Sequence, residues 1–121
     1  LKKKYTIAPL SNGNVSLLTD MAKNAGLPWD LILSAELARH YKPDPESYLS
    51  AAEFLSIKPG ELMLAAAHSG DLNSARKAGL KTGFIYRPNE RGVGGRADKA
   101  KPDEFDVVST DIVDLAAKMG A

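Results

Sequence analysis

The chain of 121 residues contains no cysteine, which excludes disulfides, thiolate metal sites and cysteine nucleophiles. Charge imbalance is also absent, because 16 Lys and Arg residues stand against 15 Asp and Glu residues, for a net charge of +1. This balance argues against a nucleic-acid or membrane surface, so we expect a small-molecule partner. No apolar run approaches the roughly 20 residues of a membrane span, and "LKKKYTIAPL" is too short in apolar residues for a signal peptide. We therefore expect a cytoplasmic protein.

What the sequence does contain is an alternation of short apolar runs and amphipathic segments. The β-α-β-α order that this alternation indicates is typical of an α/β protein with a doubly wound parallel sheet. The first expected extended run is "YTIAPLSNG" (5–13), which ends in a turn at Ser11 to Gly13. The others are "WDLILSAEL" (29–37), "ELMLAAA" (61–67), "KTGFIY" (81–86) and "FDVVS" (105–109). Because "ELMLAAA" shows no polar alternation, we expect this strand to be covered on both faces. At this length we expect one domain, 1–121.

Local residue types predict where the helices begin and end. Asn12 or Asn14 can cap a helix that runs to about Ala25, and Gly26 supplies its stop. The apolar residues of this helix recur on one face: Val15, Leu18, Met21, Ala22 and Ala25.

Later helices show similar local patterns. Asp44 before Pro45 is typical of a cap followed by proline in the first turn. Asp71 is expected to cap the helix of "LNSARKAG". The last helix contains Ile112, Leu115, Ala116 and Met119.

Polar residues follow the first three extended runs of the predicted sheet. They are "SNGN" from Ser11, "YKPDP" around Lys42, and "HSGD" from His68 to Asp71. Ligands of such sheets bind at the carboxyl ends of the strands, so we expect these groups to share one edge. Hydroxyl and backbone N–H groups can hold a carboxylate or phosphate, and a lysine can neutralise it. The sequence therefore predicts a site for a small anionic substrate.

Each of these residues also has an ordinary structural interpretation. Ser11, Asn12 and Gly13 are frequent in turns, and Asp71 alone is more often a helix cap than a catalytic group. Lys42 alone is most often a solvated loop lysine. His68 has no second histidine or acid at metal-ligand spacing, so no metal site is predicted there. The glycines of "GVGGR" neither follow a strand directly nor open a helix, which argues against a phosphate loop.

Taken in order, "LSNG", "YKPDP", "DLNSARKAGL" and "RPNERG" resemble the haloacid dehalogenase superfamily, specifically its type II L-2-haloacid dehalogenase branch. The resemblance runs from about Ile7 to the last helix. It implies a Rossmann-like fold, a three-layer α/β/α parallel sheet, here with an incomplete core. It also implies a hydrolase that replaces the halogen of a small 2-haloalkanoic acid through an aspartyl-ester intermediate, with no cofactor.

The same resemblance implies roles for particular residues. Ser11 and Asn12, with Gly13 beside them, would contact the substrate carboxylate or the nucleophile, and Lys42 would balance their negative charge. Asp71 would orient Lys42 or the hydrolytic water. Tyr48 matches a tyrosine near dehalogenase sites, although a core-packing role is equally consistent with its pattern.

The family's nucleophile, an aspartate in a DxxGT motif, has no counterpart here, because no acid precedes Ser11. We therefore expect the chain to be the carboxyl-terminal part of a core domain, without the nucleophile strand or the cap, and inactive alone. A competing α/β module without catalysis would expose an unpaired sheet edge and self-associate, for example as a homodimer.

A family phosphatase is the second alternative. Such enzymes generally place an acid four residues before the aspartate that matches Asp71, and the pair helps to bind magnesium. Ala67 occupies that position, which favours a reaction without metal. Dehalogenases in turn tend to carry serine and asparagine where this chain has Ala66 and His68, so His68 would replace the asparagine as a hydrogen-bond donor near the substrate.

Overall fold

The computed structural model describes residues 1–121, which divide into two compact units, Leu1–Ile57 and Lys58–Ala121. Both units are α/β, and every strand pair in them is parallel, as the sequence predicts. No helix has the length and apolar character needed to cross a membrane. The expectation of a single domain stays a prediction.

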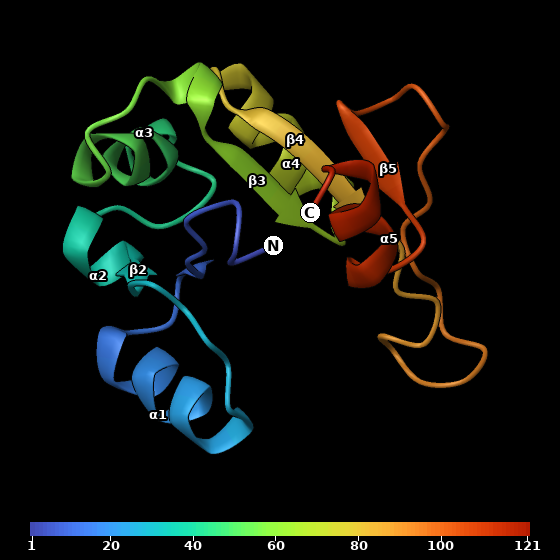
Figure 1. Ribbon diagram of the computed structural model, residues 1–121, viewed down its shortest axis with the longest axis horizontal. Coiled ribbons are helices and arrows are strands. Elements are labelled where there is room, and N and C mark those ends of the chain that lie inside the picture. Colours follow the sequence, from blue (N-terminus) through green and yellow to red (C-terminus); the bar gives the residue numbers. More distant parts are fainter. The chain divides into compact units, whose positions relative to one another are not determined.

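The first unit contains a small two-stranded sheet and three helices (Figure 1, blue to green). Strand β1 is Leu10–Ser11 and β2 is Leu33–Ser34, paired in parallel with Leu10 opposite Leu33. The helices are α1 (Val15–Ala25), α2 (Ala35–Ala38) and α3 (Pro45–Phe54).

The strand expected over 5–13 is wrong in length, since only two of its residues pair with β2. Pro9 has no N–H to offer a ladder, although its carbonyl accepts from Leu33 at 3.2 Å. Upstream, the side chain of Asp30 accepts the N–H of Ile7 at 2.8 Å, and the Asp30 N–H donates to the Ile7 carbonyl. Contacts with one loop residue thus replace the strand pairing.

Helix α1 begins and ends where its sequence predicts. The side chain of Asn14 accepts the N–H of Leu17 at 2.9 Å, and Gly26 ends the helix with a left-handed φ of 64°. No residue of α1 is buried, however, and Met21 on its apolar face is 53% exposed. The amphipathic pattern therefore predicted the helix but not a covered face.

The second unit is built on a three-stranded sheet in the order β3-β4-β5. The strands are β3 (Met63–Ala66), β4 (Lys81–Ile85) and β5 (Val107–Ser109), and the helices are α4 (Ser69–Lys77) and α5 (Ile112–Lys118). A short 3₁₀ turn, η1 (Pro59–Glu61), precedes β3. Figure 1 shows α4 behind the sheet and α5 in front of it, so this unit has three layers.

A glycine in β4 allows the close approach of α5. A Cβ at Gly83 would lie 3.1 Å from Met63 Sδ and 3.4 Å from Leu115 Cδ1, so a larger residue would push the helix away. The neighbouring Phe84 points to the opposite face, since side chains alternate along a strand. There its ring stacks on Phe105 with centroids 5.9 Å apart.

Coverage of β3 differs from the expectation. Leu64 is buried, but Ala65, which points to the other face, is exposed. The absence of alternation correctly indicated a strand. The expectation of coverage on both faces is wrong, because coverage depends on which distant segments pack there.

The long loop between β4 and β5 returns to the sheet through a few specific contacts. Arg76 of α4 donates to the carbonyl of Glu104 and places its guanidinium 4.9 Å from the centre of the Phe105 ring. The side chain of Asp106 accepts the N–H of Thr82 at 2.7 Å and its hydroxyl at 3.0 Å. These bonds lower the pKa of Asp106 below its ordinary value.

Candidate functional site

The residues predicted for the site divide between the two units. Ser11, Asn12, Gly13, Lys42 and Tyr48 belong to the first, whereas His68 and Asp71 belong to the second. Ser11 to Gly13 lie at the carboxyl end of β1, and His68 follows the carboxyl end of β3. The expectation that Lys42 also follows a strand directly is wrong, because helix α2 stands between β2 and Lys42. Convergence of the two groups on one substrate stays a prediction.

The turn after β1 is held by side-chain hydroxyls. The N–H of Gly13 donates to Ser11 Oγ at 3.1 Å, and the hydroxyl of the buried Ser34, the last residue of β2, donates to the carbonyl of Gly13. Ser11 is half-buried at the end of its strand. The turn interpretation is therefore correct for these residues, and it does not conflict with a binding role.

Asn12 and Lys42 lie together, although 30 residues separate them. The backbone N–H of Lys42 donates to Asn12 Oδ1 at 2.7 Å, and Asn12 Nδ2 donates to the Lys42 carbonyl at 3.2 Å. This two-point contact sets the position of the Lys42 backbone relative to the carboxyl end of β1. The Lys42 residue is itself half-buried, which is unlike a freely solvated loop lysine.

Helix α3 follows this lysine directly. It begins at Pro45 after Asp44, as predicted, but the Asp44 side chain makes no capping hydrogen bond and lies 3.6 Å from His40. Tyr48 in the first turns of α3 is fully buried. Its burial agrees with the core-packing interpretation, and a contact with substrate stays a prediction.

Only one group of side chains could hold a metal ion by proximity. It consists of His40, Asp44 and Glu46, whose ligand atoms lie within 4.8 Å of one another and which are all exposed. None of these residues was predicted as part of the site.

The expected helix cap at Asp71 is wrong. Helix α4 begins at Ser69, so the cap position falls on His68 and Asp71 lies in the first turn. The free N–H of Ser69 is satisfied by the carboxylate of Asp98, at 2.8 Å. Asp98, 29 residues away along the chain, therefore supplies the hydrogen-bond acceptor that the local sequence predicted at Asp71.

A second distant acid holds His68. Both carboxylate oxygens of Glu90 lie 3.0 Å from His68 Nε2, and Arg87 lies 3.6 Å from the same carboxylate. In a neutral His68 this arrangement places the proton on Nε2 and leaves Nδ1 as an acceptor. Sequence reasoning missed the contacts of Glu90 and Asp98, although Glu90 lies in the quoted "RPNERG", because no local pattern in the long loop between β4 and β5 indicates which distant residue a side chain contacts.

Comparison with known proteins connects this arrangement to one family. The chain is 38% identical over 85 residues, 69% of its length, to (S)-2-haloacid dehalogenase 4A of Burkholderia cepacia. It is 55% identical to a defluorinating L-2-haloacid dehalogenase of known crystal structure, with 99% of the chain covered and a TM-score of 0.94. The chain belongs to the haloacid dehalogenase superfamily.

Another member of the superfamily, an L-2-haloacid dehalogenase of known crystal structure, matches at 49% identity over 98% of the chain with a TM-score of 0.93. The chain spans about half the length of these two structures, 49% and 51%, and 37% of the Burkholderia relative. No family model matches the chain. The predicted Rossmann-like α/β fold of the haloacid dehalogenases is confirmed by these structures.

The segment that leads from the end of β3 into α4 begins with two alanines. Ala66 and Ala67 carry no polar group, so Asp71 is the one acid between the end of β3 and the second turn of α4. His68 and its Glu90 partner bring the polar chemistry of the loop instead.

Proposed function

We propose that the whole protein is a hydrolase that removes halide from a small 2-haloalkanoic acid. The observation that carries this proposal is the two-point contact of Asn12 with the Lys42 backbone at the carboxyl end of β1. It fixes the backbone of a lysine beside a turn that carries a hydroxyl, and a cation and a hydroxyl are the groups that recognise a carboxylate substrate. The dehalogenases that match the chain are consistent with this substrate class.

The proposed reaction has two steps. An aspartate carboxylate of the whole protein attacks carbon 2, forming a carbon–oxygen bond as the carbon–halogen bond breaks and halide leaves with its electron pair. Water then attacks the ester, which releases the 2-hydroxy acid and a proton and restores the carboxylate. The sum is haloacid plus water to hydroxy acid, halide and a proton.

Residues of this chain would provide electrostatic support for both steps. In our proposal Lys42 balances the charges of the substrate and nucleophile carboxylates, and Ser11 and Asn12, with Gly13 beside them, offer hydrogen-bond donors to them. Asp71 positions Lys42 or the hydrolytic water. His68, oriented by Glu90, provides a ring nitrogen where the related dehalogenases tend to have an asparagine, and Tyr48 would contribute to the pocket wall.

We also propose that the reaction requires no metal ion. A magnesium site in this fold would need a second acid near Asp71, and Ala67 stands at the position where that acid is expected. A phosphatase activity is the outcome that this proposal excludes.

The decisive measurement is chloride release from L-2-chloropropionate by the whole protein, with and without a chelator. We expect release that resists the chelator and that falls about 10²- to 10³-fold in Lys42→Ala, because one charge-stabilising group is lost. Lys23→Ala on α1 is the matched control and should keep the full rate. Magnesium-dependent release of phosphate from a monoester, with no chloride release, would overturn the proposal.

Two further features belong to the proposal. We expect a cytoplasmic location, which fractionation of the source cells would test. We expect the protein to form a homodimer, and light scattering that gives a monomer mass at micromolar concentration would contradict this.

A further inference from the structure

A cavity of about 730 Å³ lies along the outer edge of β5 in the second unit. Its walls come from the end of β4, from β5, from Lys99, Ala100 and Pro102 of the long loop, and from the last turn of α5. None of the residues predicted for the site from the sequence lines it. Its volume lies within the range of about 300 to 1,000 Å³ that is typical of small-molecule sites.

Much of the lining is apolar. Tyr86 is half-buried immediately after β4, and Val107 and Val108 are half-buried on the edge strand. Ala100 and Pro102 of the long loop lie across from them. These side chains could cover a flat or branched hydrocarbon group of a ligand, and burying such a group is favourable by about 25 cal/mol per Å².

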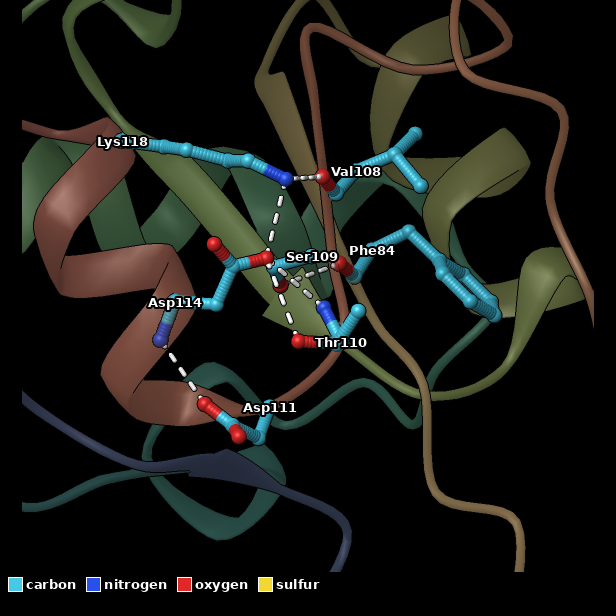
Figure 2. Close-up of polar contacts among 7 residues, drawn as sticks. All are labelled: Phe84, Val108, Ser109, Thr110, Asp111, Asp114 and Lys118. Atoms are coloured by element: carbon cyan, nitrogen blue, oxygen red, sulfur yellow. Dashed lines mark hydrogen bonds and ion pairs between the residues drawn. The ribbon is translucent and has the colours of Figure 1, made fainter.

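Two of the charged groups in the lining are already engaged. The Asp106 carboxylate accepts both donors of Thr82. Lys118 donates to the carbonyl of Val108 at 2.8 Å and to Asp114 at 2.9 Å, as Figure 2 shows. An ammonium has three donors, so one N–H of Lys118 remains for a ligand.

The contact of Lys118 with Val108 also closes the edge of the sheet. Strand β5 pairs with β4 on one side only, and no strand accompanies it on the other. A lysine on the carbonyl of such an edge strand blocks pairing with a further strand. The cavity is therefore suited to a small molecule and not to an added peptide strand.

Lys99 is the charged group of the lining that makes no hydrogen bond or ion pair within the chain. Its ammonium is exposed, and the single acid of the lining, Asp106, is already bonded to Thr82. The groups of the cavity that can still form hydrogen bonds are therefore positively charged donors. The complementary ligand group is an anion.

From these contacts we propose that the cavity binds a small amphipathic carboxylate. Its apolar body lies against Tyr86 and the valines of β5, and its carboxylate accepts from Lys99 and from the remaining N–H of Lys118. The argument for this site is independent of the proposed dehalogenation, because the two proposals use different residues.

The test is a titration of the isotope-labelled whole protein with phenylacetate, followed by amide NMR shifts. A ligand of about ten heavy atoms is expected to bind in the millimolar range. The shifts should map to residues 107–110 and 99–102, and phenylacetamide, which is neutral but of the same shape, should bind at least about tenfold more weakly.

Two variants separate the lysine from general charge. Lys99→Gln should weaken phenylacetate binding about tenfold, whereas Lys101→Gln, an exposed lysine of the same loop outside the lining, should leave it unchanged. Equal binding of the acid and the amide, equal effects of the two variants, or shifts elsewhere in the molecule would each overturn the proposal. Because this experiment measures ligand binding, its result does not depend on whether the protein releases chloride.

Discussion

The two units reach the same kind of local order by different means. In the first, two strands of two residues each are held by side chains, with Asn12, Asp30 and Ser34 bonding to the backbone of distant residues. In the second, a three-stranded ladder carries a helix on each face, and Leu72 and Phe84 are buried between the layers. The small sheet of the first unit is therefore held mainly by individual polar side chains, with the buried Tyr48 on α3, whereas the sheet of the second unit is held mainly by a packed core.

Because of this difference, residues that mainly stabilise the fold and residues that mainly position the candidate site lie in different parts of the chain. A polar contact such as Asn12 to Lys42 contributes modestly to folding but determines where a lysine stands. A packed residue such as Leu72 contributes several kcal/mol wherever it lies. Substitutions that distinguish these two kinds of contribution can break or sharpen the comparison.

The largest expected effect is on the core of the second unit. Leu72→Ala should lower the free energy of unfolding by about 3 kcal/mol, because Leu72 is fully buried. The matched change Leu17→Ala on α1, where the leucine is 51% exposed, should cost less than about 0.5 kcal/mol. Urea unfolding followed by circular dichroism measures both, and similar costs would show that α1 is packed as firmly as α4.

The next effect concerns a polar contact that supports the sheet of the second unit. Asp106→Ala should lower the free energy of unfolding by about 2 kcal/mol, because it leaves the N–H of the fully buried Thr82 without its acceptor. Asp103→Ala in the same loop, an exposed aspartate with no partner, should be nearly neutral. Thermal unfolding compares the pair, and equal midpoints would contradict the role of Asp106.

Acid should weaken the second unit through the same carboxylate. The pKa of Asp106 is lowered from 3.8, mainly by the N–H of Thr82, so the folded state binds this proton less readily than the unfolded chain does. Its contribution is complete above pH 3.8 and is lost as the pH falls below that value. Urea unfolding between pH 6 and pH 2.5 should show this loss in the native protein and a smaller one in Asp106→Asn.

In the first unit the main effect should appear in the rate. Asn12→Ala should reduce chloride release by the whole protein about tenfold, because the Lys42 backbone loses both of its bonds to β1. Asn14→Ala removes the cap of α1 and should cost about 1 kcal/mol of stability with an unchanged rate. If Asn12→Ala lost stability but kept its rate, the contact would be structural only.

The smallest effect is expected at the start of α4. Asp98→Ala removes the acceptor for the Ser69 N–H and should cost about 1 kcal/mol, the usual value for a lost helix cap. Asp71→Ala should cost less stability, because Asp71 is not the cap. A larger loss of stability in Asp71→Ala than in Asp98→Ala, measured by thermal unfolding, would indicate that Asp71 caps the helix.

Sequence patterns predicted the features that depend on neighbouring residues. Asn14 and Gly26 mark the two ends of α1, and the apolar runs mark β3, β4 and β5, because caps and strand propensity act over a few residues. Where a contact spans the chain, prediction failed. Asp98, and not Asp71, accepts the N–H of Ser69 in the first turn of α4, and no residue near Ser69 in the sequence predicts this contact.

The same limit applies to the candidate site. Ser11, Asn12, Lys42, His68 and Asp71 were predicted from residue type and from their order after the expected strands. That Asn12 bonds the Lys42 backbone, and that Glu90 holds His68, could not be found, because loop residues have no periodicity that indicates a partner.

By itself the sequence determined the parallel α/β class and the positions of most strands and helices, since these follow from local propensity and apolar patterning. It missed α2 (Ala35–Ala38), which begins inside the run expected to be extended over 29–37. Tertiary structure alone decided which distant acids and amides satisfy the backbone groups of each turn. The physical reason is that a buried or terminal N–H must find an acceptor, and any segment that folds within reach can supply it. Asp98, Asp106 and Asn12 met that requirement here.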